Sequence, residues 1–149
     1  ELRIPSRVLI LVASSVLSGV PAASIQKYWL VVEKFVASAL KYSNGRYRLV
    51  DVFAALIKQD MQLWVAGNED GSVKVCAITE VIDYPSMRVA NFFLVAGEER
   101  EGWLHHLESV EEWAREKGCV KLELRGRKGW EKVLKDWNMS QIILEKDLL

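Results

Sequence analysis

Three consecutive strand-like segments in the middle of the chain, of which the second alternates apolar and polar side chains, constrain the fold more than any other feature. The turn Asn68-Glu69-Asp70-Gly71 separates the first two, with Gly71 at a position that can take positive φ. Tyr84-Pro85-Ser86 separates the second from the third. The pattern predicts three neighbouring antiparallel strands in one sheet. They are Gln62–Ala66, Val73–Val81 and Arg88–Val95.

After these strands, the spacing of apolar residues changes from strand-like to helical and then back to strand-like. Apolar side chains at helical spacing predict a helix over Trp103–Lys117, which Gly118 ends. Val120–Leu124 alternates again and predicts a strand. A further helix over Lys128–Asp136 and a last strand over Gln141–Lys146 follow. A strand, a helix and a second strand in this order predict a crossover connection.

The residues before the three strands predict one strand and two helices. Val8–Ala13 is rich in β-branched residues and suits a buried strand. The same region also resembles a secretory signal, with Arg3 and Arg7 before the apolar run and small residues near Pro21. Helical spacing of apolar residues then predicts helices over Ile25–Tyr42 and about Val50–Lys58.

The predicted order is β-α-α-β-β-β-α-β-α-β. It indicates an α/β fold with a mixed, mostly antiparallel central sheet and helices on both faces. A chain of 149 residues is the usual size of one domain, so residues 1–149 are predicted to form a single unit. No stretch reaches the roughly 20 apolar residues that a membrane-spanning helix needs.

Charge and cysteine content exclude several classes of function. Lys plus Arg equals Asp plus Glu at 20 each, so the chain lacks the basic excess of a typical nucleic-acid binder. Cys76 and Cys119 are too few for a disulfide framework or a four-ligand zinc site. His105 and His106 are adjacent on a predicted helix and point apart, so no shared metal ion is expected.

Two stretches carry a resemblance to a known family. The first is "MRVANFFLVAGEEREGWLHHLESVEEWAREKGCVKLEL", and the second is "GRKGWEKVLKDWNM". With the order of elements they resemble the GNAT acetyltransferase superfamily. More narrowly, "MQLWVAGNEDGSVKVCAITEVIDYP" together with "WAREKGCVKLELRGRKGWEKVL" resembles small GNAT-like proteins encoded among tailed-phage morphogenesis genes.

The resemblance implies a site for acetyl-CoA. In such proteins two neighbouring strands splay apart around the pantetheine arm, and backbone N–H groups of the next loop hold the pyrophosphate. The matching positions here are Val95, Gly97, Arg100 and Gly102. An enzyme reading requires an open gap between the strands near Leu94 and Leu122.

The loop after the third strand departs from the family's pattern. Its Gly spacing is incomplete, Arg100 is out of register, and Glu98, Glu99 and Glu101 lie where the pyrophosphate should bind. Two like charges about 6 Å apart at an effective dielectric near 20 repel by roughly 3 kcal/mol. Acidic residues are also ordinary in the first turn of a helix. This loop favours a protein that does not use acetyl-CoA.

The sequence offers few catalytic groups. Glu80 and Asp83, on and after the long strand, are candidate bases, and Cys119 is a candidate acid for the leaving thiol. The helix where the family typically has a Tyr carries Trp130 and Trp137 instead, and an indole cannot supply a proton.

A basic strip lies beside these two Trp residues. Cations next to aromatic rings can contact nucleic acid or an acidic protein surface, although a solvated helix face is the favoured explanation of the strip. The predicted interaction residues are Arg125, Arg127, Lys128, Trp130, Lys132 and Trp137, and Lys135 extends the strip.

Two functions therefore stand open. The first is a non-catalytic GNAT-fold protein that acts by contact as a phage virion or assembly component, in the virion or the host cytoplasm. Its partners would be other virion proteins or further copies of itself, with nucleic acid a weaker candidate and no membrane. It needs no cofactor and predicts exposed Trp or Leu side chains in a patch. The second is an acetyl-CoA-dependent N-acetyltransferase for an amine on a small molecule or protein.

Overall fold

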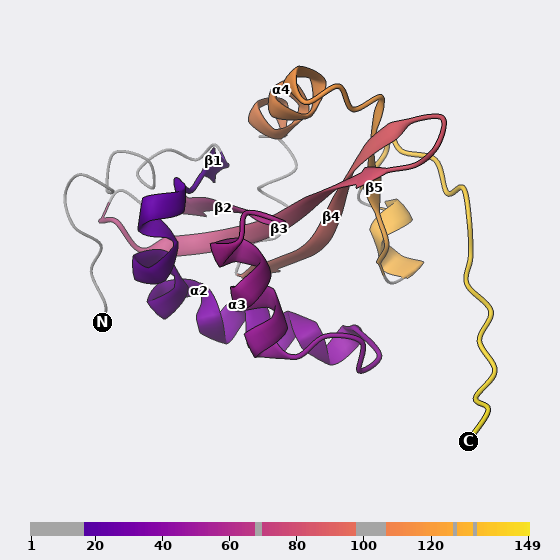
Figure 1. Ribbon diagram of the computed structural model, residues 1–149, viewed down its shortest axis with the longest axis horizontal. Helices are drawn as coiled ribbons and strands as arrows, with labels where there is room; N and C mark the ends of the chain where they lie inside the picture. Colours follow the sequence, from indigo (N-terminus) through magenta and orange to yellow (C-terminus); the bar gives the residue numbers. More distant parts are fainter. Residues whose placement is uncertain (1–16, 68–69, 98–106, 127, 133) are drawn as a thin grey trace.

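The computed structural model describes residues 17–67, 70–97, 107–126, 128–132 and 134–149 (Figure 1). The strands are β1 (Ser18–Gly19), β2 (Gln62–Gly67), β3 (Val73–Asp83), β4 (Arg88–Gly97) and β5 (Lys121–Leu124). The α-helices are α2 (Ile25–Ala39), α3 (Leu49–Ile57) and α4 (Glu108–Glu116). Short 3-10 helices are η1 (Ala22–Ser24), η2 (Leu40–Tyr42) and η4 (Lys128–Lys132).

The five strands form one sheet in the order β1-β2-β3-β4-β5. The first three pairs are antiparallel, and β4 pairs with β5 in parallel. The connection from β4 to β5 carries α4, because parallel neighbours need a crossover rather than a hairpin. The predicted three-strand run and the crossover after it are confirmed.

Helices α2 and α3 cover one face of the sheet, and α4 lies on the other side (Figure 1). The first core lies under α2 and α3, where Ile25, Tyr28, Val32 and Val36 from α2 are at most 1% exposed. Their spacing of three and four residues places them on one helix face. They pack against Leu56 of α3 and against β2 and β3.

The second core lies on the α4 side. It contains Trp64, Phe92 and Val110, and all three are buried. The indole N–H of Trp64 donates to Thr79 Oγ1 at 2.9 Å, so this buried polar pair is satisfied. Trp113 of α4 contacts Trp64 edge to face with 5.5 Å between ring centroids. Helices on both faces of a mixed sheet agree with the predicted fold class.

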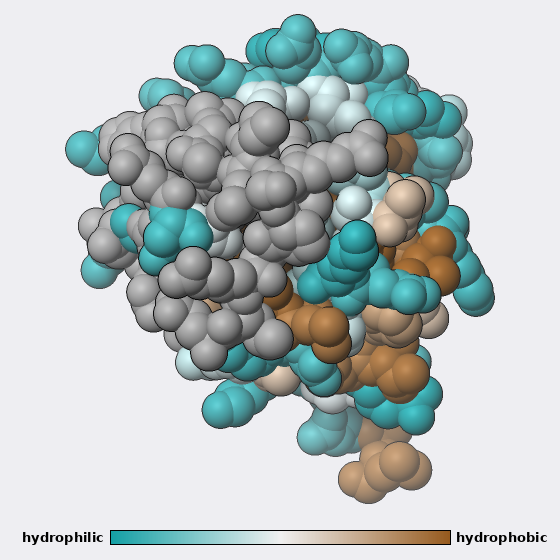
Figure 2. All heavy atoms as spheres, turned by 90° about the vertical axis from the view of Figure 1, so that its left-hand side faces the viewer, coloured by the Kyte–Doolittle hydropathy of each residue, from teal (hydrophilic) through white to brown (hydrophobic). Residues whose placement is uncertain are grey.

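Two predicted elements near the end of the chain are wrong. The helix expected over Lys128–Asp136 is the 3-10 helix η4, which ends at Lys132. The strand expected over Gln141–Lys146 is absent, and residues 138–149 are exposed and form no regular structure. A strand needs a partner for its N–H and C=O groups, and alternation alone does not supply one. The apolar group that projects at the bottom of Figure 2 is the end of this segment, which is also lowest in Figure 1.

Some predictions fall outside the described residues. They include the strand over Val8–Ala13, the first half of the hairpin turn at Asn68, and the start of the helix predicted from Trp103. The first described strand, β1, follows the predicted one and pairs with β2 through Ser18 and Gly19. Among the described residues, no helix is long and apolar enough to cross a bilayer.

Candidate active site

Strand β4 separates from β5 at a defined point. Their pairing runs from Val89 and Lys121 to Phe92 and Leu124, and no β5 residue pairs with the rest of β4. The next residue, Phe93, is the extra residue of a bulge, because Ile78 faces Leu94 while Thr79 faces Phe92. A bulge bends its strand and increases the local twist. The bulge therefore explains why the two strands diverge after Phe92.

A groove opens where the strands diverge. Its walls include β4 from Phe92 to Gly97 and the chain from Leu122 to Gly126. Phe93 does not plug the groove, because its ring packs edge to face on Tyr47 at 4.6 Å and on the first core. Within the described residues, a broad hollow borders both strands where they diverge, and it also reaches η2 and the C-terminal segment. The position of Trp103 lies outside the described residues.

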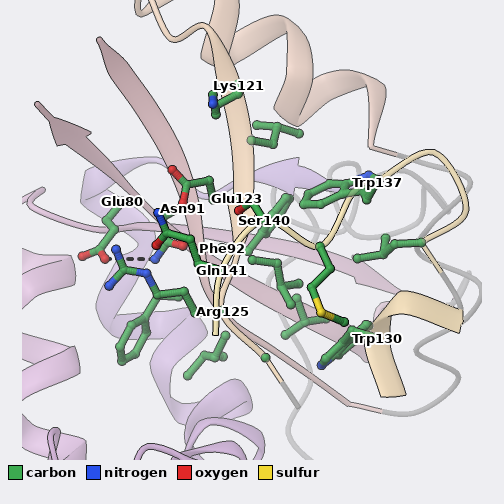
Figure 3. A pocket seen from close by; sticks show the side chains of 18 of the residues that line it. Glu80, Asn91, Phe92, Lys121, Glu123, Arg125, Trp130, Trp137, Ser140 and Gln141 are labelled. Atoms are coloured by element: carbon green, nitrogen blue, oxygen red, sulfur yellow. Dashed lines mark hydrogen bonds between the residues drawn. The ribbon is translucent and has the colours of Figure 1, made fainter. Parts of the chain in front are cut away.

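Three polar side chains form a row across the sheet at the point of divergence. Glu80 of β3 is the register partner of Asn91 of β4, and Asn91 is the partner of Glu123 of β5. Leu122 and Leu124 pack on the second core, so alternation places Glu123 on the opposite, α2 and α3 face. The close view shows Glu80, Asn91 and Glu123 beside one another (Figure 3).

Asn91 is the buried centre of this row. It is 4% exposed, and its Nδ2 donates to Glu80 Oε1 at 3.1 Å. Its Oδ1 has no hydrogen-bond partner among the described residues, although Asn91 lines the groove. A buried amide oxygen without a partner costs on the order of 1–3 kcal/mol. The oxygen atom itself is covered, so it can accept an N–H group from a ligand only if the atoms over it move.

The rim of the row is basic and aromatic. Arg125, just after β5, donates from Nη2 to the Tyr84 hydroxyl at 3.2 Å. Figure 3 shows Arg125 on the same side of β5 as Glu80 and Asn91, with Trp130 and Trp137 on the other side. The groove thus has a polar wall and an apolar wall on the two sides of one strand.

Close packing fixes the apolar wall. Trp137 lies with its ring centroid 6.3 Å from that of Phe92. Trp130 lies so close to Gly126 that a Cβ there would collide with the indole, so only glycine fits this position. Leu122 and Leu124 complete the wall. In the described ranges, no three His, Cys, Asp or Glu side chains are grouped to hold a metal ion.

Comparison with solved structures gives the fold family. A probable acetyltransferase matches with a TM-score of 0.64 and 13% identity over 89% of this chain and 96% of that chain. An aminoglycoside acetyltransferase from an uncultured soil metagenomic sample matches with 0.64 and 10% over 89% and 96%. A ribosomal-protein-alanine N-acetyltransferase from Brucella melitensis biovar Abortus 2308 matches with 0.58 and 12% over 88% and 98%.

The chain has a GNAT-like fold. No family model matches the sequence, and no curated protein matches it. The identities of these structures are too low to carry more than the fold. The predicted resemblance to GNAT acetyltransferases is confirmed at this level.

The three predicted catalytic residues lie in different parts of the fold. Glu80 lies in the polar row. Asp83 does not, because it is exposed at the end of β3 in an ion pair with Arg88. Cys119 is near the groove but precedes β5, at the end of the strand away from the divergence. Burial raises the pKa of the Cys119 thiol, so the neutral form is favoured there.

The predicted cofactor residues are described in part. Val95 and Gly97 lie on β4 beyond its last pair with β5, and both line the groove. Gly97 has φ near 120°, and a Cβ there would collide with the Lys74 carbonyl, so the position requires glycine. Arg100 and Gly102 lie outside the described residues, as do Glu98, Glu99 and Glu101.

The predicted interaction residues that the structure describes with side chains, Arg125, Trp130, Lys132 and Trp137, border the same hollow. Arg125 and Trp130 lie on opposite sides of β5 (Figure 3). Lys132 and Lys135 are exposed, while Trp130 and Trp137 are half-buried against the second core. Arg127 lies outside the described residues, and of Lys128 only the backbone is described. None of the described Trp side chains is exposed, so the expected patch of Trp is not found on this part of the chain.

The sequence prediction did not include Asn91 or Glu123. Strand alternation gives the face of each residue, but it does not give the register that aligns them with Glu80. One feature could have identified Asn91. It is the single amide within "VANFFLVA", an otherwise apolar strand, and a buried amide there needs a partner or a ligand.

Proposed function

We propose that the chain is an acetyl-CoA-dependent N-acetyltransferase that acts on an amine of a small molecule or protein. One observation carries the proposal. Beyond Phe92 and Leu124 the strands diverge into an open groove, and the row Glu80, Asn91 and Glu123 lies at the point of divergence. The likeness in fold to solved acetyltransferases supports it.

The described residues fit the pantetheine arm of acetyl-CoA. Past Phe92, β4 has no strand partner on its β5 side, so backbone groups between Phe93 and Gly97 are available to the amides of a ligand. Val95 and Gly97 are the predicted cofactor positions on this segment. Bound acetyl-CoA would supply an acetyl thioester, an activated acyl group ready for transfer to nitrogen.

The row of Glu80, Asn91 and Glu123 has the charge and hydrogen-bond acceptors to bind the amine of the substrate. A protonated amine is attracted by the carboxylates of Glu80 and Glu123, and Asn91 Oδ1 can accept one of its N–H groups. The amine must lose a proton before its lone pair can attack a carbonyl. Glu80 is the general base of the proposal, held in place by the hydrogen bond from Asn91 Nδ2.

Acetyl transfer with Glu80→Gln tests the assignment. The wild-type protein should acetylate at least one amine in a panel of polyamines, aminoglycosides and lysine peptides, with products measured by mass spectrometry. Loss of the base should lower kcat by about 10²–10⁴-fold. Glu112→Gln is the matched control, because Glu112 is an exposed carboxylate on α4, and it should leave the rate unchanged.

Absence of product from every amine class, or full activity in Glu80→Gln, would refute the proposal. The other predicted function, a phage virion or assembly component without a cofactor, remains a prediction. The exposed Ile and Leu side chains of residues 142–149 fit its expectation of exposed apolar residues, whereas the groove and the polar row favour the enzyme. It would gain support if the protein produced no product and also bound no acetyl-CoA.

A further inference from the structure

Opposite charges without ion pairs lie on one wall of the groove. Glu123 and Arg125 are two residues apart in extended chain, so their side chains point to the same face. Figure 3 shows the Arg125 side chain on that face together with Glu80 and Asn91. Among the described residues, no ion pair joins Arg125 to a carboxylate, and none joins Glu80 or Glu123 to a cation. A wall that carries both charges without pairing them can bind a ligand that carries both.

The Tyr84 hydroxyl holds the guanidinium of Arg125 in place. Nη2 of Arg125 donates to this hydroxyl at 3.2 Å, and both residues line the groove. A guanidinium has several N–H donors, and this hydrogen bond uses one of them. The remaining donors can bind a carboxylate through two parallel hydrogen bonds. Arg125 is therefore a positioned site for an anionic group.

This anion site lies next to the carboxylates that attract the amine. One residue separates Glu123 from Arg125, so their Cα atoms are about 6.6 Å apart along the chain. An ammonium group bound at Glu80 and Glu123 is therefore a short distance from the guanidinium. An α-amino acid carries its amine and its carboxylate on one carbon atom, which matches this close spacing. A polyamine would instead place a second cation beside Arg125, which is repulsive.

Aromatic side chains adjoin the two charged sites. Phe93 follows Asn91 by two residues and packs on the α2 and α3 side of the sheet, where its ring contacts Tyr47 edge to face with 4.6 Å between centroids. Tyr47 is 38% exposed and lines the groove, so part of this pair is available to a ligand. Exposed aromatic rings beside polar groups are a contact surface for an apolar or aromatic side chain.

We propose that the acceptor is a free α-amino acid with an apolar or aromatic side chain, whose carboxylate is bound by Arg125 and whose amine is bound by Glu80 and Glu123. This assignment rests on the proposed acetyl transfer, because it names the class of acceptor for that site. Glu80 takes the proton that leaves the amine neutral, and the nitrogen then bonds to the acetyl carbon as the C–S bond breaks. The second amine proton goes to the leaving thiolate, so the products are an N-acetyl amino acid and coenzyme A.

Matched ligand pairs test the carboxylate site by binding alone. L-phenylalanine and L-methionine are titrated calorimetrically beside their carboxamides, with and without coenzyme A. The free acids should bind about tenfold tighter, because the carboxamides keep the amine but lose the anion. Arg125→Gln should weaken binding of the free acids by about 10–100-fold and leave the carboxamides unchanged. Lys27→Gln, which removes an exposed cation on α2, is the matched control and should change neither.

Acetylation of the same ligands distinguishes this assignment from the proposed function. Added to the amine panel, the free acids should have the highest kcat/KM, and Arg125→Lys should recover only part of the loss in Arg125→Gln, because an ammonium lacks the bidentate fork. Equal binding of acids and carboxamides, or tighter binding of phosphoethanolamine than of either acid, would overturn the amino-acid assignment, while product from other amines would still support the transferase. Binding that depends on Arg125 without any acetylated product would refute the transferase and leave the amino-acid site standing.

Discussion

The two ends of the sheet differ in how completely they are covered. At β2 and β3 both faces are closed, because Cys76 and Ile78 on one face and Ala77 on the other are 0% exposed. At β5 every residue is half-buried or exposed. Helices α2 and α3 cover the first end and stop short of the second (Figure 1). The bulge at Phe93 marks the boundary between the two ends.

Stability and binding therefore depend on different ends of the sheet. Closed layers of apolar side chains provide most of the free energy of folding. They leave no room for a ligand, whereas the open end holds a groove, the buried Asn91 and an unpaired edge. Substitutions at the covered end should therefore change stability, and substitutions at the open end should change binding.

The largest stability effect is expected at the covered end. Leu56→Ala removes a side chain with 0% exposure between α3 and the sheet and should lower the free energy of unfolding by about 3 kcal/mol. Leu30→Ala is the matched control on α2, because Leu30 is 63% exposed, and its effect should stay within about 0.5 kcal/mol. Urea denaturation measures both, and equal losses would contradict the comparison.

The next largest loss of stability is expected when the buried hydrogen bond between Trp64 and Thr79, on the α4 side of the sheet, is removed. Thr79→Val removes the hydroxyl that accepts the Trp64 indole N–H and donates to Gln62 Oε1 at 3.0 Å. The unpaired indole should cost about 1–3 kcal/mol in chemical denaturation. Thr79→Ser keeps the hydroxyl and should lose much less stability. A Val variant as stable as the Ser variant would show that the hydrogen bond contributes nothing.

A smaller effect is expected in the apolar wall of the groove. Gly126→Ala introduces a Cβ that collides with the Trp130 indole, so the ring must move away from β5 at a cost of about 1 kcal/mol. The fluorescence emission of Trp130 should shift to longer wavelength as the indole becomes exposed. Gly129→Ala, with no atom within 4 Å of the new Cβ, is the control. Identical spectra for the two variants would contradict the described packing.

The last prediction concerns the pH dependence of stability at the covered end. Burial raises the pKa of Tyr28 to about 12, from an unfolded value near 10. The folded state therefore holds this proton more tightly, and its contribution to stability is complete below pH 10 and lost as pH rises toward 12. Denaturation at several pH values should show this slope, and Tyr28→Phe should remove it. An unchanged slope in the variant would assign it to another group.

The covered end could be predicted from the sequence, and the open end only in part. The segments 62–67, 73–83 and 88–97 are rich in β-branched and aromatic residues and are separated by turn residues, so their strands were predicted to within two residues. The register that aligns Glu80, Asn91 and Glu123 depends on the bulge at Phe93, which local patterns do not reveal. The last predicted strand was wrong because its partner, if any, is not determined by local sequence.

The proposed activity requires that the groove beside β4 binds acetyl-CoA, and a calorimetric titration measures this directly. Saturable binding with a dissociation constant on the order of 1–100 μM is expected. Adenosine diphosphate, which lacks the pantetheine arm, should bind more weakly, because the described part of the groove fits that arm. No measurable heat with millimolar acetyl-CoA, or equal affinity for the two nucleotides, would contradict it.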